Sequence, residues 1–177
     1  MLSEGGERYA LSHVPVQHAG ALALFAPPAA ASGTGYLSAR SWDLTDGDAR
    51  VELAQVSAVG ARSVFALVLD PQHWWRFEIA DGVLRCQDQQ EAGRSQTESS
   101  YDVHAHRYLR IAHHAAQSTL TWEVSPDGAD WTVLRTRSAS WSVRGLRAEL
   151  ALYADEPGAQ GSTVFQHFSL HSGIFDP

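Results

Sequence analysis

The chain has 177 residues, of which 44% are hydrophobic and 19% charged, a composition that excludes an intrinsically disordered protein. We predict a single domain over residues 1–177, with a core at about 8–171. The thirteen basic residues are all arginine, and the net charge of −7 excludes a nucleic-acid-binding surface, which needs clustered positive charge.

Cysteine content and hydropathy exclude two further features. Cys86 is the single cysteine, so no internal disulfide can form, and its strand-like surroundings favour a packed thiol over a nucleophile. The first ten residues carry no basic and no apolar region, so no signal peptide is expected and a cytoplasmic location is compatible. The apolar, alanine-rich segment 19–33 is interrupted by Pro27 and Pro28 and is too short to cross a bilayer, so no membrane span is expected.

Short segments rich in Val, Leu and aromatic residues dominate the chain and are separated by Gly, Pro, Asp or Ser. In chain order these predicted strands lie at 49–57, 62–70, 73–81, 107–114, 118–125, 130–136, 146–154 and 162–171. Segment 27–35 is predicted as a loop, and the polar segment 88–100 as exposed. Asp81-Gly82 predicts a two-residue hairpin turn. Because no window shows a helical stripe, the pattern predicts an all-β antiparallel sandwich or barrel, and two stacked sheets are the economical arrangement.

Alternation separates an inward apolar face from an outward mixed face in four of these segments. Segment 62–70 is apolar on both faces, which predicts a central strand. The outward residues elsewhere are aromatics mixed with arginine and glutamate: Trp74, Arg76, Glu78, Tyr108, Arg110, Glu123, Glu149 and Tyr153. If their strands are neighbours, the rings offer an apolar plate to the C–H face of a sugar, and the charged groups can bind hydroxyls. We predict these eight residues as a carbohydrate-binding face; the alternative is a solvated sheet with cross-strand Arg–Glu pairs.

The acidic turn "SPDG" at 125–128 has a conformational explanation for each residue. Pro126 has the fixed φ of the second turn position, Asp127 tolerates the third, and Gly128 supplies a positive φ. Asp127 therefore needs no ligand, and we expect the preceding Trp122 to anchor the core.

The segment 101–134, with "HRYLRI", a strand holding Trp122, "SPDG" and then Trp131, resembles the concanavalin A-like lectin/glucanase superfamily. It is most similar to the jelly-roll module on the C-terminal side of bacterial beta-xylosidases, and the similarity extends over most of 35–171. The resemblance implies a two-sheet antiparallel jelly-roll sandwich of about 14 strands, whose sheet or rim loops bind carbohydrate. Glycosidase members carry a Glu-x-Asp-x-x-Glu strand; this chain lacks it, because Glu78 and Asp81 lie across a turn.

Histidine spacing raises the possibility of a metal site. His104 and His106 are two apart, a spacing that places strand residues on one face, but no third ligand lies at a diagnostic distance. Surface histidines explain the pattern, so no metal and no cofactor are predicted. The chain also lacks the Gly-x-Ser-x-Gly and Gly-x-Gly-x-x-Gly motifs.

The sequence leaves catalysis open and favours a non-catalytic, lectin-like carbohydrate-binding module. One alternative is a glycoside hydrolase with Glu78 and Glu123 as its carboxylates. Another is a protein-interaction or structural module with no small ligand, for which a protein partner or a homo-oligomer would be expected.

Overall fold

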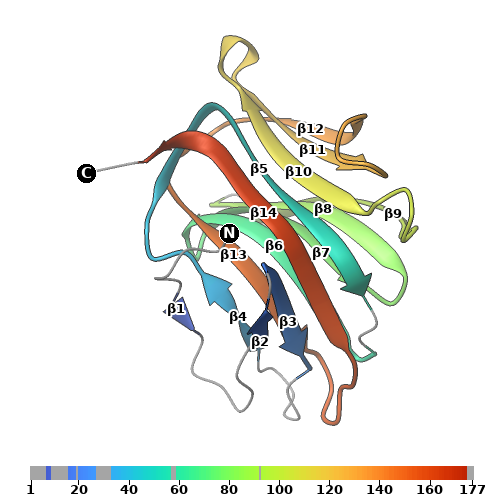
Figure 1. Ribbon diagram of the computed structural model, residues 1–177. Helices are drawn as coiled ribbons and strands as arrows, with labels where there is room; N and C mark the ends of the chain where they lie inside the picture. The colour runs from blue at the N-terminus through green and yellow to red at the C-terminus, as the bar shows by residue number, and fades with distance from the viewer. Residues whose placement is uncertain are drawn as a thin grey trace.

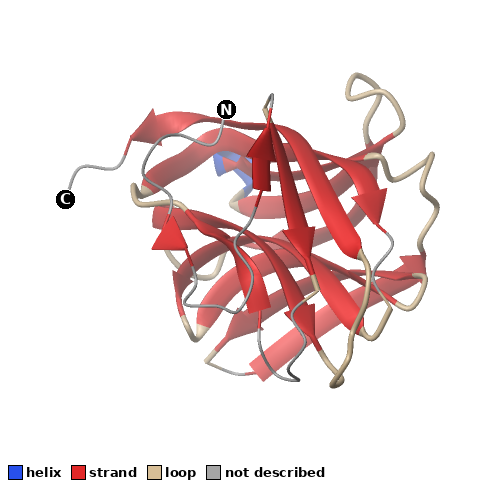
Figure 2. Ribbon diagram, turned by 60° about the horizontal axis from the view of Figure 1, so that its bottom comes forward, coloured by secondary structure: helices blue, strands red, loops and turns tan. Residues whose placement is uncertain are grey.

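The computed structural model describes residues 7–8, 16–18, 20–26, 33–56, 59–91 and 93–174. Over these residues the chain forms fourteen strands and one short 3-10 turn, η1 (Ala115–Gln117). Figure 1 shows the strands in two layers, and Figure 2 shows the layers with the bottom of that view turned forward. None of the described residues belongs to a helix long and apolar enough to cross a membrane.

Each layer is an antiparallel sheet of seven strands. Sheet A runs in spatial order β1 (Glu7–Arg8), β4 (Gly33–Leu37), β13 (Arg144–Ala154), β6 (Ala61–Asp70), β7 (His73–Ala80), β8 (Val83–Gln90) and β9 (Gly93–Ser100). Sheet B runs β2 (Val16–His18), β3 (Ala21–Phe25), β14 (Ser162–Ile174), β5 (Trp42–Val56), β10 (Tyr108–His114), β11 (Thr119–Ser125) and β12 (Thr132–Ser138). The start of β13 also pairs with the start of β5 and joins the sheets at one corner. The predicted all-β, two-sheet jelly-roll sandwich is confirmed.

The predicted inward faces form the core between the two sheets. These side chains are all 5% exposed or less: Trp75, Phe77, Ile79, Leu109, Ile111, Leu120, Trp122, Val124, Leu146, Ala148, Leu150 and Leu152. Each large apolar side chain contributes about 1.5–3 kcal/mol by its burial. The alternation in the sequence therefore assigns the faces of β7, β10, β11 and β13 correctly.

The side chains of Trp122 and Arg135 make polar contacts that connect the sheets through this core. The indole Nε1 of Trp122 on β11 donates a hydrogen bond of 3.1 Å to the backbone carbonyl of Arg76 on β7, which confirms Trp122 as a core anchor. The guanidinium of Arg135 on β12 forms a buried ion pair with Asp88 on β8 and also donates to the Cys86 carbonyl. The Cys86 thiol is packed at 2% exposure, as predicted.

The central strand and its hairpin turns follow the sequence signals. β6 is the fourth of the seven strands of sheet A, and both of its faces are buried between Val64 and Leu67. Asp81 and Gly82 have φ values of +51° and +73° and connect the paired residues Ala80 and Val83. Positive φ at both central positions is the geometry of a tight hairpin turn.

Six of the fourteen strands lie outside the eight predicted ranges, and two segments differ from what was predicted for them. Within the predicted loop 27–35, residues 33–35 belong to β4, and residues 27–32 lie outside the described part of the chain. Most of segment 88–100 is exposed as expected, but Asp88 is buried, and the segment contains the end of β8 and the whole of β9. β9 is an edge strand with solvent on both faces, so its sequence shows no apolar alternation.

The acidic turn has the conformational role that the sequence indicates. Gly128 has a φ of +78°, and its amide donates to Oγ of Ser125 at 2.9 Å. The Asp127 carboxylate accepts the amides of Ala129 at 2.8 Å and Asp130 at 3.0 Å. Bonds from the Asp130 and Ala129 amides lower the pKa of Asp127, because they favour the charged form.

Candidate functional site

The structure divides the eight predicted face residues between the two sheets. Five of them lie on the outer face of sheet A, on β7 and β13: Trp74, Arg76, Glu78, Glu149 and Tyr153. Three lie on the outer face of sheet B, on β10 and β11: Tyr108, Arg110 and Glu123. β10 pairs with β5 and β11 rather than with β7, so the eight residues form two separate faces on opposite sides of the sandwich.

The three residues on sheet B are occupied by contacts within the protein. The Arg110 guanidinium forms an ion pair with Glu123 and lies 4.1 Å from the centre of the Trp131 ring. Glu123 also accepts a 2.5 Å hydrogen bond from the Thr121 hydroxyl and is 3% exposed. The ring of Tyr108 packs beside the turn at Gly128, where a Cβ would lie 3.4 Å from it. These contacts give Tyr108, Arg110 and Glu123 a structural role that does not need a ligand.

A hollow of about 370 Å³ nevertheless lies on sheet B. Its lining is predominantly polar: Arg50, Val51, Tyr108, Asp127, Gly128, His167, Ser169 and His171. Apart from the two imidazoles, Tyr108 has the one aromatic ring among these residues. The two histidines pair with carboxylates of β5. His167 lies 2.6 Å from Glu52, and His171 lies 3.3 Å from Asp48.

A second hollow, of about 360 Å³, lies on the outer face of sheet A, and we call it the sheet A hollow. Its lining combines small apolar, aromatic and charged side chains: Ala66, Val68, Pro71, Trp74, Arg76, Glu149 and Tyr153. The small side chains of β6 form the floor, where Ala66 packs with Val64 of the same strand and Ala151 of β13. Trp74 comes from β7 on one side of β6, and Tyr153 from β13 on the other.

Tyr153 is held in place by its neighbours. Its hydroxyl donates a hydrogen bond to the Glu149 carboxylate, and the Arg62 guanidinium lies 5.7 Å from its ring centre. The ring also lies against Gly33 of β4, where an added Cβ would come within 2.5 Å of a ring carbon. Glycine at this position is therefore required for the observed placement of the ring.

A closed circuit of hydrogen bonds fixes the charged groups beside the hollow. Its members come from three adjacent strands of sheet A: Arg76, Glu78, Arg85, Gln87, Gln96 and Glu98. Arg76 donates to Gln87 at 2.6 Å and to Glu78 at 2.7 Å, and Arg85 reaches the other Glu78 oxygen at 3.5 Å. Burial lowers the pKa of Arg76, Glu78 raises it, and the charges of Arg94 and Arg62 lower it further. A connected network of this kind holds the Arg76 side chain in one orientation.

The Trp74 ring has two guanidinium neighbours. Arg76 lies two residues away on the same strand, with its guanidinium carbon 4.3 Å from the ring centre. Arg94 on β9 reaches the ring from two strands away, at 5.3 Å. Cation–π contacts of this kind are worth about 0.5–1 kcal/mol at exposed sites and orient the ring.

The glycosidase alternative that pairs Glu78 with Glu123 is wrong in its geometry. Glu78 lies on the outer face of sheet A and Glu123 on the outer face of sheet B, so the sandwich separates them. Packed sheets are about 10 Å apart, and both side chains point away from that space. Glycosidase carboxyls lie about 5–9.5 Å apart across a cleft.

The histidine spacing also leads to a different structure. His104 and His106 lie in a turn rather than a strand, where Asp102 accepts the His104 amide at 2.8 Å. The His106 ring accepts the Asp102 amide at 3.0 Å. The two imidazoles therefore do not share a strand face, and the described residues contain no group of three or more potential metal ligands.

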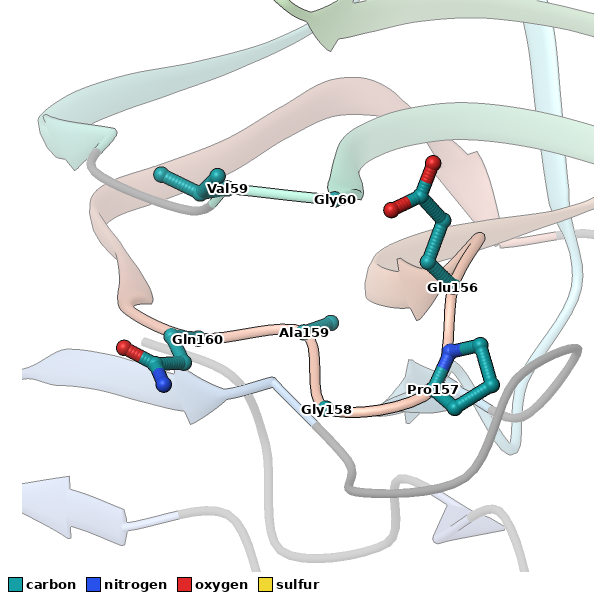
Figure 3. A pocket seen from close by; sticks show the side chains of 7 residues that line it. All are labelled: Val59, Gly60, Glu156, Pro157, Gly158, Ala159 and Gln160. Atoms are coloured by element: carbon teal, nitrogen blue, oxygen red, sulfur yellow. The ribbon is translucent and has the colours of Figure 1, made fainter.

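A further hollow, of about 300 Å³, lies among the loops and carries few functional groups. It is lined by Val59, Gly60, Glu156, Pro157, Gly158, Ala159 and Gln160. Figure 3 shows the polar side chains of Glu156 and Gln160 on opposite sides of it, so they do not converge on one point. Its walls are largely the backbone of a turn, in which the Asp155 amide donates to the Gly60 carbonyl at 2.9 Å.

Sequence reasoning missed several residues of the sheet A site. Arg94 and Gln96 belong to β9, in a segment that was predicted only as polar and exposed, and Gln87 belongs to β8, which is not among the predicted strands. The floor residues Ala66 and Val68 were visible as the second apolar face of 62–70, a signal that was used only to place the strand. An apolar residue on the outward face of a strand is the sign that would have identified the floor.

Comparison with solved structures agrees with this architecture, whereas comparison of the sequence alone finds no match. No family model matches the sequence, and no curated protein matches it. Among solved structures, a Crh5 transglycosylase in complex with NAG has a TM-score of 0.66 at 12% identity, covering 98% of this chain and 79% of that one. A legume lectin-like domain from Entamoeba histolytica has a TM-score of 0.61 at 10% identity, covering 89% and 86%.

A xylan beta-1,4-xylosidase from Bacillus halodurans C-125 is similar over 86% of this chain but only 33% of its own, with a TM-score of 0.61 and 11% identity. These likenesses show the fold, a jelly-roll sandwich of the kind found in lectin-like domains and glycosidase modules. The resemblance to concanavalin A-like modules, including that of beta-xylosidases, is confirmed at the level of the fold.

Proposed function

We propose that the protein binds carbohydrate in the sheet A hollow and acts as a non-catalytic, lectin-like module. One observation carries the proposal: Trp74 and Tyr153 flank a floor of small apolar side chains, while Arg76 and Glu149 line the same space. A sugar ring has apolar C–H faces and a rim of hydroxyls, so it matches aromatic walls combined with a guanidinium and a carboxylate. The volume of about 360 Å³ is at the lower end for small-ligand pockets and suits a short saccharide.

The arrangement of carboxylates supports binding rather than hydrolysis. Hydrolysis of a glycosidic bond by the usual routes needs two carboxyls flanking it. Glu149 is the one carboxylate that lines the sheet A hollow. Glu78, another carboxylate on this face, has Arg76 on one oxygen and Arg85 on the other, and it is not part of the lining.

The preorganisation of the site also supports the proposal. The Arg76 circuit and the Tyr153–Glu149 hydrogen bond fix polar groups before any ligand arrives. A ligand then loses little binding energy to the ordering of side chains. The hollow on sheet B has Tyr108 as its one phenol or indole ring, whereas the sheet A hollow has Trp74 and Tyr153, so sheet B offers less aromatic surface to a sugar.

A glycan array followed by calorimetric titration of the best ligand tests this function. Trp74→Ala and Tyr153→Ala should each weaken binding by about tenfold or more, the equivalent of about 1.4 kcal/mol. Tyr108→Ala is the matched control, because it removes an aromatic ring from the outer face of the other sheet. It should leave the affinity unchanged.

Three outcomes would argue against the proposal. Loss of binding in Tyr108→Ala alone would move the site to sheet B. No binding to any glycan by the folded wild-type protein would favour an interaction module without a small ligand. Hydrolysis of aryl-glycosides that is lost in Glu149→Gln would show that the site is catalytic.

A further inference from the structure

Several arginines lie on the outer face of sheet A, and they differ in their partners. Arg62 lies 3.3 Å from Asp155, Arg76 lies 2.7 Å from Glu78, and Arg85 lies 2.9 Å from Glu98. These three positive charges are compensated within the protein.

Arg94 differs from them, because no described residue provides a carboxylate within ion-pair distance of its guanidinium. Its neighbour across the ladder on β8 is Gln89, a neutral residue. β9 is the edge strand of sheet A, so no strand on its other side supplies a partner. The contact that holds the guanidinium is the Trp74 ring at 5.3 Å.

The register explains why this charge lies beside the hollow. Trp74, Gln89 and Arg94 form one row across β7, β8 and β9, and all three point to the outer face. The Arg94 side chain reaches back over Gln89 to Trp74, which lines the hollow. An uncompensated cation therefore lies next to the aromatic wall, while the compensated Arg76 lies within the hollow itself.

We propose that the natural ligand of the sheet A hollow is an anionic saccharide, and that Arg94 binds its carboxylate or sulfate group. This inference rests on the proposed carbohydrate-binding function and specifies its ligand class. A guanidinium presents a planar fork of donors that matches a carboxylate or a sulfate ester, and it can stack on an aromatic ring at the same time. The Trp74 ring would contact the sugar face, and Arg94 would contact the charged substituent at the rim.

The acidic group in the hollow is placed where it does not oppose this arrangement. Glu149 comes from β13, across β6 from Trp74, whereas Arg94 approaches Trp74 from β9 on the opposite side. A saccharide can thus direct neutral hydroxyls toward Glu149 and Tyr153 and its anionic group toward Arg94. The two ends of the site have opposite charge preferences, which would also fix the orientation of the ligand.

Matched ligand pairs provide the test. Tetramers of glucose, galactose and mannose are each compared by calorimetry with the corresponding uronic-acid tetramer and with a 6-sulfated tetramer. In at least one series we expect an anionic member to bind about tenfold more tightly than its neutral counterpart, and the advantage should shrink at high salt. Preference for the uronate identifies a carboxylate as the natural group, and preference for the sulfated form identifies a sulfate.

Variants connect the preference to one residue. Arg94→Gln should abolish the anionic advantage while binding of the neutral tetramer stays the same, and Arg94→Lys should keep part of the advantage. Arg144→Gln is the control, because it removes an exposed arginine paired with Asp43, outside the lining of the hollow. It should change neither affinity.

Three results would overturn the inference. Equal affinity for neutral and anionic members in every series would contradict it while leaving the proposed function in place. An anionic advantage that persists in Arg94→Gln would contradict the role of Arg94. Absence of binding to all tetramers, neutral and anionic, would reject both the inference and the function on which it rests.

Discussion

Gly33→Ala perturbs the proposed site without changing any residue that lines the hollow. Gly33 has no positive φ, so its backbone accepts alanine, and the obstacle is the ring of Tyr153. The new Cβ would lie 2.5 Å and 2.7 Å from two ring carbons, whereas ordinary contacts begin near 3.4 Å. The ring must therefore withdraw by about 1 Å, and its hydroxyl would move away from Glu149.

The size of the effect follows from these contacts. Overpacking of this kind costs about 1–3 kcal/mol, and the ring is partly exposed, so we expect a loss of about 1–2 kcal/mol in the free energy of unfolding. The displaced aromatic wall should weaken saccharide binding by about tenfold. Urea unfolding and calorimetric titration measure the two quantities.

A double-mutant cycle isolates the cause. In a Tyr153→Ala background the clash has no partner, so Gly33→Ala should then cost almost nothing in stability or affinity. If Gly33→Ala is equally destabilising with and without the Tyr153 ring, the account of the ring's placement is refuted.

The remaining predictions concern the core and the acidic turn. Trp122→Phe removes the hydrogen bond from Trp122 to the Arg76 carbonyl and should lower the free energy of unfolding in urea by about 1–3 kcal/mol. An unchanged urea midpoint would show that this bond does not stabilise the protein. Asp88→Asn leaves the buried Arg135 guanidinium without its anion and should cost about 3–5 kcal/mol, whereas Asp88→Leu combined with Arg135→Met should recover most of that loss. Burial raises the pKa of Cys86 to about 12, so the folded protein should react with a thiol reagent at pH 8 only as fast as it unfolds, and rapid labelling would contradict this. The pKa of Asp127 is lowered in the folded state, so its charge stabilises the protein above about pH 4, and that stabilisation is lost as the pH falls further. The difference in the free energy of unfolding between the wild type and Asp127→Asn should therefore shrink below about pH 4. A difference that stays constant down to about pH 3 would be evidence against this role of Asp127.

The sequence predicted the faces of the strands well and their neighbours poorly. The alternation of apolar and polar residues around Trp75 and Trp122 is a local signal, because it depends on which side of each strand meets the core. It can therefore be recognised in a single segment before the fold is known. Whether Tyr108 lies beside Trp74 depends on which strands pair, and the structure pairs β10 with β5 and β11. Pairing is a property of the whole chain, and the hydrophobic pattern of a single segment does not contain it.

Six of the fourteen strands have no counterpart among the eight predicted ones: β1, β2, β3, β4, β8 and β9. Two of them show local reasons for this. β9 is polar because both of its faces meet solvent, and with it the sequence analysis missed Arg94. β4 begins with glycines, which usually indicate a loop. At Gly35 an added Cβ would lie 2.5 Å from the Leu150 carbonyl oxygen, so here glycine permits close approach of two strands.

The central claim is that a saccharide binds on the outer face of sheet A. Backbone amide chemical shifts, followed by NMR while the best saccharide is added, test it most directly. The account predicts the largest changes in β6, β7 and β13 around Ala66, Trp74 and Tyr153, with smaller changes near Arg94 for an anionic ligand. Changes concentrated on β5, β10 and β14, or no changes in the presence of saturating ligand, would contradict it.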